Sequence, residues 1–302
     1  MMPVPFVLLI CAMAAVWLPA PRLRGWPGIP VWAVLYAASL VAAVAQAYVE
    51  PVGAAALLVF AALTVAVRRV ARPALYGPLF VLLALMALAL AMHKVPGFHN
   101  PIAIDAVRFS PDARPFTQYL NFDKGSVGLL LLAVLAPRLG RGEASGALLA
   151  RTALLALGVA GVVLGLAAAA GLVRWDPKWP PQTLQFLLVN LFLTCVAEEG
   201  FFRVLVQDAF QGLRAGRGAG SRAGAAPSPW GWRTALAMLG SAALFGVAHA
   251  GAGAWMIAVA GVAGLGYAAA YAWRRSIEVP ILVHLGVNAV HFLLFSYPAL
   301  QR

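Results

Sequence analysis

Long runs of apolar residues, separated by short polar segments, follow one another along the whole of this 302-residue chain. A hydrocarbon layer about 30 Å thick requires about 20 apolar residues of helix to cross it. Ten segments approach this length and predict an all-α fold, a polytopic bundle of about ten transmembrane helices. The predicted spans are residues 4–20, 30–48, 52–67, 75–92, 124–137, 147–173, 183–210, 233–249, 254–273 and 279–297. The fifth segment is short, and a re-entrant helix is the alternative for it.

Composition supports the membrane class. The chain is 63% hydrophobic and 11% charged, whereas soluble domains carry about 25% charged residues. The net charge of +12 does not indicate nucleic-acid binding, because the cations cluster in every second loop and not along one face. The positive-inside rule places these loops in the cytoplasm and both termini outside. The arginines concerned are Arg22, Arg24, Arg68, Arg69, Arg72, Arg138, Arg141, Arg214, Arg217, Arg222, Arg274 and Arg275.

Two connections are long. Residues 211–232 are rich in Gly, Ala, Arg and Pro without apolar periodicity, which predicts a flexible cytoplasmic linker. Residues 93–123 form a loop of a length that is usually functional or disordered. Its aromatic residues suggest a cap at the membrane interface: Phe98, Phe109, Phe116, Tyr119 and Phe122.

Two adjacent carboxylates and an arginine stand inside the seventh apolar segment: Glu198, Glu199 and Arg203. A charge at the centre of a membrane helix costs roughly 2.5 to 3.5 kcal/mol on insertion scales, so these groups require partners and a purpose. Adjacent helical residues project about 100° apart, which gives the two glutamates different environments, whereas Glu199 and Arg203 share a face. One glutamate can be held ionised while the other, in a drier place, serves as a general base. A neutral pair that joins two helices is the structural alternative.

Histidines occur at the end of one later segment and within another. His249 closes the eighth segment, where a lone histidine more often caps helix carbonyls than takes part in catalysis. His284, Asn288 and His291 follow at i, i+4 and i+7, so they form a polar stripe on one face of the tenth segment. An asparagine one turn from a histidine can orient the ring or donate to an oxyanion, although interhelical hydrogen bonds also explain such a stripe.

Three short motifs therefore stand in order on three of the last four segments. They are Glu198-Glu199-x-x-x-Arg203, Phe245-x-x-x-His249 and His284-x-x-x-Asn288. In this combination they resemble the CAAX protease and bacteriocin-processing family of intramembrane endopeptidases, also called the Abi family. The resemblance covers roughly residues 183–292, the predicted protease domain. It leaves residues 1–173 as an N-terminal transmembrane extension of unknown role.

The resemblance implies hydrolysis of a peptide bond within the bilayer, at a catalytic site between the last four spans. It implies Glu198 as the general base that activates water, assisted by His284. His249 and Asn288 are expected near the tetrahedral intermediate. The residues expected to support this base are Glu199 and Arg203.

Two other chemistries stay open at these residues. His249, His284 and a glutamate would make a His2Glu zinc set like those of soluble metallopeptidases. The chain has no His-Glu-x-x-His helix, so a metal-free glutamate protease without a cofactor is favoured over one with a zinc ion. A thiol route through Cys195 is disfavoured, because the negative charge of Glu199 one turn away opposes thiolate formation.

The expected partners are the lipid bilayer and a membrane-associated protein or peptide substrate, with no nucleic acid. The Ala, Arg and Gly bias is compatible with a high-GC bacterial gene, and hence with a multi-pass protein of the bacterial inner membrane. Two other functional classes are a proton-coupled transporter and a catalytically silent membrane scaffold. The first six segments hold almost no ionisable group to extend a proton relay, and the motifs are intact, so the endopeptidase is preferred.

Overall fold

The computed structural model describes residues 2–19, 28–140, 142–215, 228 and 231–301. Within these residues each of the ten apolar segments is helical. Five of the described helices are long and apolar enough to cross a membrane: Pro51–Arg69, Pro73–Ala91, Gly146–Ala169, Thr183–Phe210 and Ala254–Arg274. Shorter apolar helices are Val4–Trp17, Val31–Ala45, Trp232–Ala248 and Glu278–Leu294. The chain is therefore a mainly helical integral membrane protein, and the count of ten spans stays a prediction.

Part of the predicted topology falls on residues outside this description. These residues are Arg22, Arg24, Arg141, Arg217 and Arg222, together with 216–227 and 229–230 of the predicted linker. The assignment of the arginine-rich loops to the cytoplasm stays a prediction.

The chain forms two compact units that interleave along the sequence. Unit 1 comprises Met1–Ala103, Tyr119–Leu135 and Phe192–Phe201, and unit 2 comprises Ile104–Gln118, Ala136–Leu191 and Phe202–Arg302. The predicted division into residues 1–173 and 183–292 concerns function and stays a prediction. The compact units cross that boundary, because unit 1 includes the middle of the seventh helix.

Unit 1 is built around a buried helix. Its outer helices are α1 (Val4–Ala14), α2 (Val31–Ala45), α3 (Pro51–Arg69) and α4 (Pro73–Ala91). Helix α5 (Phe122–Leu130), which continues in π-helical winding over Leu131–Leu135, packs against α1, α3 and α4 and is buried at nearly every residue. The fifth apolar segment is thus the central helix of this unit, which explains why it is apolar although it is short.

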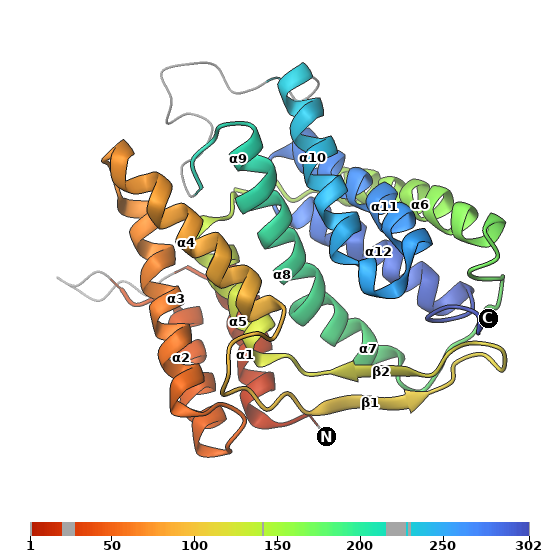
Figure 1. Ribbon diagram of the computed structural model, residues 1–302, viewed down its shortest axis with the longest axis horizontal. Helices are drawn as coiled ribbons and strands as arrows, with labels where there is room; N and C mark the ends of the chain where they lie inside the picture. Colours follow the sequence, from red (N-terminus) through yellow and green to blue (C-terminus); the bar gives the residue numbers. More distant parts are fainter. Residues whose placement is uncertain (1, 20–27, 141, 216–227, 229–230, 302) are drawn as a thin grey trace. The chain divides into compact units, whose positions relative to one another are not determined.

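Unit 2 contains the last helices of the chain. They are α6 (Gly146–Ala169), α7 (Thr183–Val189), α9 (Asp208–Phe210), α10 (Trp232–Ala248), α11 (Ala254–Arg274) and α12 (Glu278–Leu294). Helix α11 packs against α6, α10 and α12, and α12 also packs against α6 (Figure 1). Small residues permit these contacts, as is common between membrane helices. A Cβ on Gly246 of α10, for example, would lie 2.5 Å from the carbonyl oxygen of Ile257 on α11.

A short hairpin departs from the predicted all-α fold. Strands β1 (Ile102–Val107) and β2 (Phe116–Tyr119) pair within the long loop of residues 93–123. Strands this short leave too weak a pattern to be recognised beside so many apolar helices. In unit 2, Phe109 and Phe116 of this loop pack into an aromatic cluster that also contains Phe186, Phe292 and Tyr297. Its position at a membrane interface stays a prediction.

The residues after α12 form an extended segment, here called the C-terminal strap (residues 295–301). Its backbone amides at Ser296 and Leu300 donate to the carbonyl oxygens of Arg174 and Leu172, at 2.9 and 2.8 Å. The amide of Gln301 donates to the carbonyl oxygen of Asp112 at 2.9 Å. The strap is thus held by two loops of unit 2.

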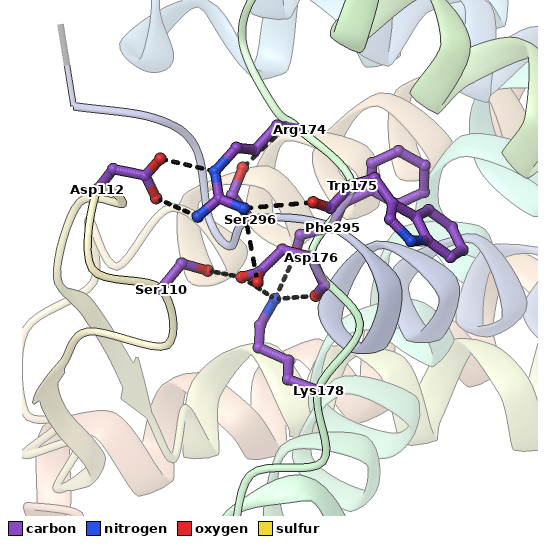
Figure 2. Close-up of polar contacts among 8 residues, drawn as sticks. All are labelled: Ser110, Asp112, Arg174, Trp175, Asp176, Lys178, Phe295 and Ser296. Atoms are coloured by element: carbon purple, nitrogen blue, oxygen red, sulfur yellow. Dashed lines mark hydrogen bonds and ion pairs between the residues drawn. The ribbon is translucent and has the colours of Figure 1, made fainter.

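Charged side chains reinforce these backbone contacts (Figure 2). The Asp112 carboxylate accepts bonds from Arg174 Nε at 2.7 Å and Nη2 at 2.9 Å. Lys178 Nζ lies 3.3 Å from Asp176 Oδ2 and also donates to the carbonyl oxygen of Phe295. The hydrogen bond from Arg174 lowers the pKa of Asp112. Burial raises the pKa of Asp176, but hydrogen bonds from Ser110 and Lys178 outweigh it, so the net shift of that pKa is downward.

These shifts predict that the ion pairs of Asp112 and Asp176 beside the strap lose stability in acid. A carboxylate whose folded-state pKa is depressed contributes fully above its unfolded pKa of about 3.9, and the contribution disappears as pH falls through the folded pKa. We expect Asp112→Asn to melt below wild type at pH 7, and the difference in Tm to shrink once the pH is below about 4. Thermal unfolding of both detergent-solubilised proteins over a range of pH measures this difference in Tm. Asp105→Asn, at an exposed position of β1, is the control. A Tm difference that is constant down to about pH 2.5 contradicts the prediction.

Candidate active site

The two glutamates lie in the middle of one continuous helix, Thr183–Phe210, whose winding changes along its length. Helix α8 (Val196–Glu199) is α-helical, and π-helical segments Asn190–Cys195 and Gly200–Gln207 adjoin it on each side. π-helical winding is rare and occurs frequently at functional sites. The sequence did not predict this π-helical winding, which adjoins the turn that contains Glu198 and Glu199.

In unit 1, Glu198 is paired with a lysine. Its Oε1 lies 2.7 Å from the Nζ of Lys124 on α5, and each of the two side chains is about one-sixth exposed, at 16% and 17%. Glu199 is fully buried. The two adjacent glutamates therefore have different environments, as expected from their angular separation on a helix.

A glycine allows α5 to come close to α8. A Cβ on Gly128 would lie 2.9 Å from both the backbone nitrogen and the Cα of Ala197. Backbone atoms cannot yield to a new side chain as a flexible side chain can, so this position requires the absence of a Cβ. The close approach brings the start of α5 within reach of Glu198.

In unit 2, Arg203 is fully buried and joins two helices. Its Nη1 donates to Gln207 Oε1 at 3.2 Å and to Ser241 Oγ on α10 at 3.1 Å. The Ser241 hydroxyl donates in turn to the carbonyl oxygen of Phe202 at 2.9 Å. Buried charges are tolerated when they are hydrogen-bonded, and this network supplies two such bonds to Nη1 of the guanidinium.

The ring of Phe245 brings three predicted site residues of unit 2 together. The Arg203 guanidinium carbon lies 6.0 Å from its centroid, the His249 ring 4.8 Å and the His284 ring 5.8 Å. His284 is 4% exposed and stacks on Tyr267, with centroids 4.4 Å apart and planes 16° apart. Residues from the seventh, eighth and tenth apolar segments thus converge on one aromatic ring.

The hydrogen bond of His249 defines which of its nitrogens can react. Its Nδ1 lies 2.8 Å from the carbonyl oxygen of Phe245, which only accepts, so Nδ1 carries a proton. In the neutral ring Nε2 is then an acceptor. His249 can donate to an oxyanion through Nε2 only as an imidazolium.

Asn288 is held by a second asparagine. Its Nδ2 donates to Oδ1 of Asn190, 3.0 Å away at the start of the π-helical segment Asn190–Cys195. Asn190 is 7% exposed. This bond restrains the side-chain amide of Asn288.

Two of these contacts were missed by sequence reasoning. Lys124 is the single charged residue in the predicted fifth span, and Asn190 is a polar residue in an apolar run. Both are polar residues inside an apolar segment, which is the feature that identified the two glutamates. Their partners were not predictable, because pairing depends on which helices pack together.

In neither unit do three His, Cys, Asp or Glu side chains of the described residues group as metal ligands. The zinc alternative draws its histidines from unit 2 and its glutamate from unit 1. Cys195 is fully buried.

One family model matches the chain. Residues 180–290 match the model described as type II CAAX prenyl endopeptidase Rce1-like. The matched range includes all three motifs, so the resemblance to the CAAX protease family is confirmed for this part of the chain, and it supports a CAAX-type intramembrane protease. No curated protein and no solved structure matches the chain.

The close contact of α5 with α8 predicts that Gly128→Ala destabilises unit 1. The new methyl group meets the backbone of Ala197, and overpacking of this kind costs about 1 to 3 kcal/mol. We expect a lower Tm in detergent. Gly158→Ala on α6 is the matched control: no atom lies within 4 Å of its Cβ position, and helical Gly to Ala is neutral or stabilising. Equal Tm values for the two variants contradict the proposed contact.

Proposed function

We propose that residues 183–292 act as an intramembrane endopeptidase that hydrolyses a peptide bond of a membrane-associated or lipidated protein substrate. The observation that carries the proposal is the family match over residues 180–290, because that range contains each of the six residues expected to do the chemistry. The ion pair of Glu198 in unit 1 and the aromatic contacts of the two histidines in unit 2 support it.

In the proposed reaction Glu198 is the general base. Its carboxylate takes a proton from water as the water oxygen bonds to the carbonyl carbon of the scissile peptide. The carbon becomes tetrahedral and its oxygen gains a negative charge. When the C–N bond breaks, the proton passes to the leaving nitrogen, and the carboxylate is regenerated. In this proposal Glu199 and Arg203 support the base, Glu198.

The unit 2 residues supply orientation and hydrogen bonds in this proposal. His284, whose ring plane is set by stacking on Tyr267, assists in orienting the water. Asn288 donates to the oxyanion with an amide that is restrained by Asn190. His249 donates to the oxyanion when it is an imidazolium and otherwise accepts a proton through Nε2.

The proposed base gives the central prediction. Glu198→Gln keeps an oxygen that can accept from Lys124 but cannot take a proton, so we expect cleavage to fall by roughly 10²- to 10⁴-fold. Comparative proteomics of new peptide termini measures the cleavage in cells that express the wild-type protein, the Glu198→Gln variant or neither. Glu50→Gln, at an exposed position of unit 1, is the matched control.

Expression level and Tm must match between Glu198→Gln and wild type for the comparison to hold. Because residues that act as one unit are not additive, Glu198→Gln/His284→Ala should be no slower than the slower single variant. If the same new peptide termini are produced by wild type and by Glu198→Gln, the proposed protease function is refuted. Ion flux into proteoliposomes that this variant abolishes would favour the transporter.

We further propose that the reaction needs no metal ion. The expected result is that cleavage in washed membranes persists after treatment with EDTA and 1,10-phenanthroline. If a zinc ion were held by His249, His284 and a glutamate, it would be the Lewis acid that activates water, and chelation would abolish activity. Loss of activity on chelation that added Zn²⁺ restores contradicts this prediction.

A further inference from the structure

We propose that Lys124 is a positioning residue for the proposed reaction: its ammonium group compensates the charge of Glu198 and holds that carboxylate in one orientation. The inference rests on the proposed function, because it takes Glu198 as the general base. It adds to the site a residue from the fifth apolar segment, outside the three motifs and outside the matched range of residues 180–290.

The contact has the geometry of a strong, charge-assisted hydrogen bond. Nζ of Lys124 and Oε1 of Glu198 are 2.7 Å apart, within the 2.7 to 2.9 Å typical of such bonds. Both side chains are more than four-fifths buried. In such surroundings an ion pair is weakly screened, so loss of one partner leaves an uncompensated charge.

The bond engages one oxygen of the carboxylate. With Oε1 held at the ammonium group, the orientation of the carboxylate is restricted, and Oε2 is the oxygen that this bond does not occupy. A base must be placed within hydrogen-bond reach of the proton that it removes, so a restricted orientation favours reaction.

The position of Lys124 is itself anchored. The preceding residue, Asp123, is fully buried, and its Oδ1 accepts from the backbone nitrogen of Lys124 at 2.8 Å and from Asn100 Nδ2 at 3.1 Å. Its Oδ2 lies 2.6 Å from His93 Nδ1. The first turn of α5 is therefore tied to the loop before it, and the Gly128 contact sets the distance between α5 and α8. These contacts hold the backbone of Lys124 in place relative to Glu198.

An ion pair that merely neutralises two buried charges is the competing explanation. It predicts that loss of Lys124 affects stability alone. A positioning role predicts a selective fall in kcat, because the orientation of the base affects the chemical step and not the binding of substrate. If Lys124 contacted the substrate, KM would rise instead.

A spectroscopic test does not depend on activity. The infrared difference between purified wild type and Glu198→Gln isolates the carboxylate band of Glu198. We expect Lys124→Met to shift that band and Lys124→Arg, which retains a positive charge, to preserve most of it. Lys94→Met makes the same substitution at an exposed lysine of unit 1 and should leave the band unchanged. A band that is identical in wild type and Lys124→Met overturns the proposal.

The kinetic test uses a quenched fluorescent peptide that contains a cleavage site lost in Glu198→Gln cells. We expect Lys124→Met to lower kcat by roughly 10- to 100-fold with KM unchanged, and Lys124→Arg to recover most of the loss. In the Glu198→Gln background, Lys124→Met should cause no further loss. Unchanged kcat in Lys124→Met, or a change in KM alone, overturns the positioning role.

Two further arms keep the outcomes separate. If Lys124→Met does not fold, Lys124→Gln, which removes the charge but keeps a hydrogen-bond donor, replaces it in both tests. An unchanged band and an unchanged kcat in Lys124→Gln then overturn the role assigned to the ammonium charge. If no termini depend on Glu198, the proposed function fails, whereas the infrared comparison still decides whether Lys124 orients this carboxylate. A failed band shift beside active wild-type protein refutes the Lys124 role alone.

Discussion

The cost of placing ionised side chains among apolar helices is the constraint on which the rest of this structure depends. A lone buried charge is expensive, so each must find a partner of opposite charge or several hydrogen bonds. Glu198 meets Lys124 in unit 1. In unit 2, Asp208 accepts from Arg275 at 2.8 Å and from Tyr271 at 3.0 Å. Lys124 stands on α5, Tyr271 on α11 and Arg275 directly after α11, so these pairs join α5 to α8 within unit 1 and α11 to α9 within unit 2.

Close packing makes these polar contacts possible. Gly128 lets α5 approach α8, and Gly246 lets α10 approach α11, since in both places a Cβ would meet backbone atoms. Around Phe245, aromatic contacts set the rings of His249 and His284 in unit 2. The proposed reaction requires its polar groups to be held to within about 0.5 Å, and hence rigid surroundings. Gly128 in unit 1, and Gly246 and the Phe245 ring in unit 2, contribute such close packing.

The helical fold was predictable to a large extent, and particular residues show why the rest was not. All ten apolar segments are helices, because apolar runs of that length have few other ways to satisfy their backbone. The hairpin of β1 and β2 escaped notice, since two short strands leave little periodicity. Lys124 was visible as a charge in the fifth segment, yet its partner lies 74 residues away in the sequence. Pairings over such separations depend on tertiary packing.

By itself the sequence determined the helical, membrane-embedded class, the three ordered motifs and the different environments of Glu198 and Glu199, because these follow from local periodicity and residue chemistry. Only the tertiary structure decided that Glu198 pairs with Lys124, that Asn288 pairs with Asn190, and that the middle of the seventh helix belongs to a unit with the N-terminal helices. The physical reason is that a side chain's partner is set by distances between helices. Of the two adjacent carboxylates that drew attention to the seventh segment, Glu198 has Lys124 as its cationic partner.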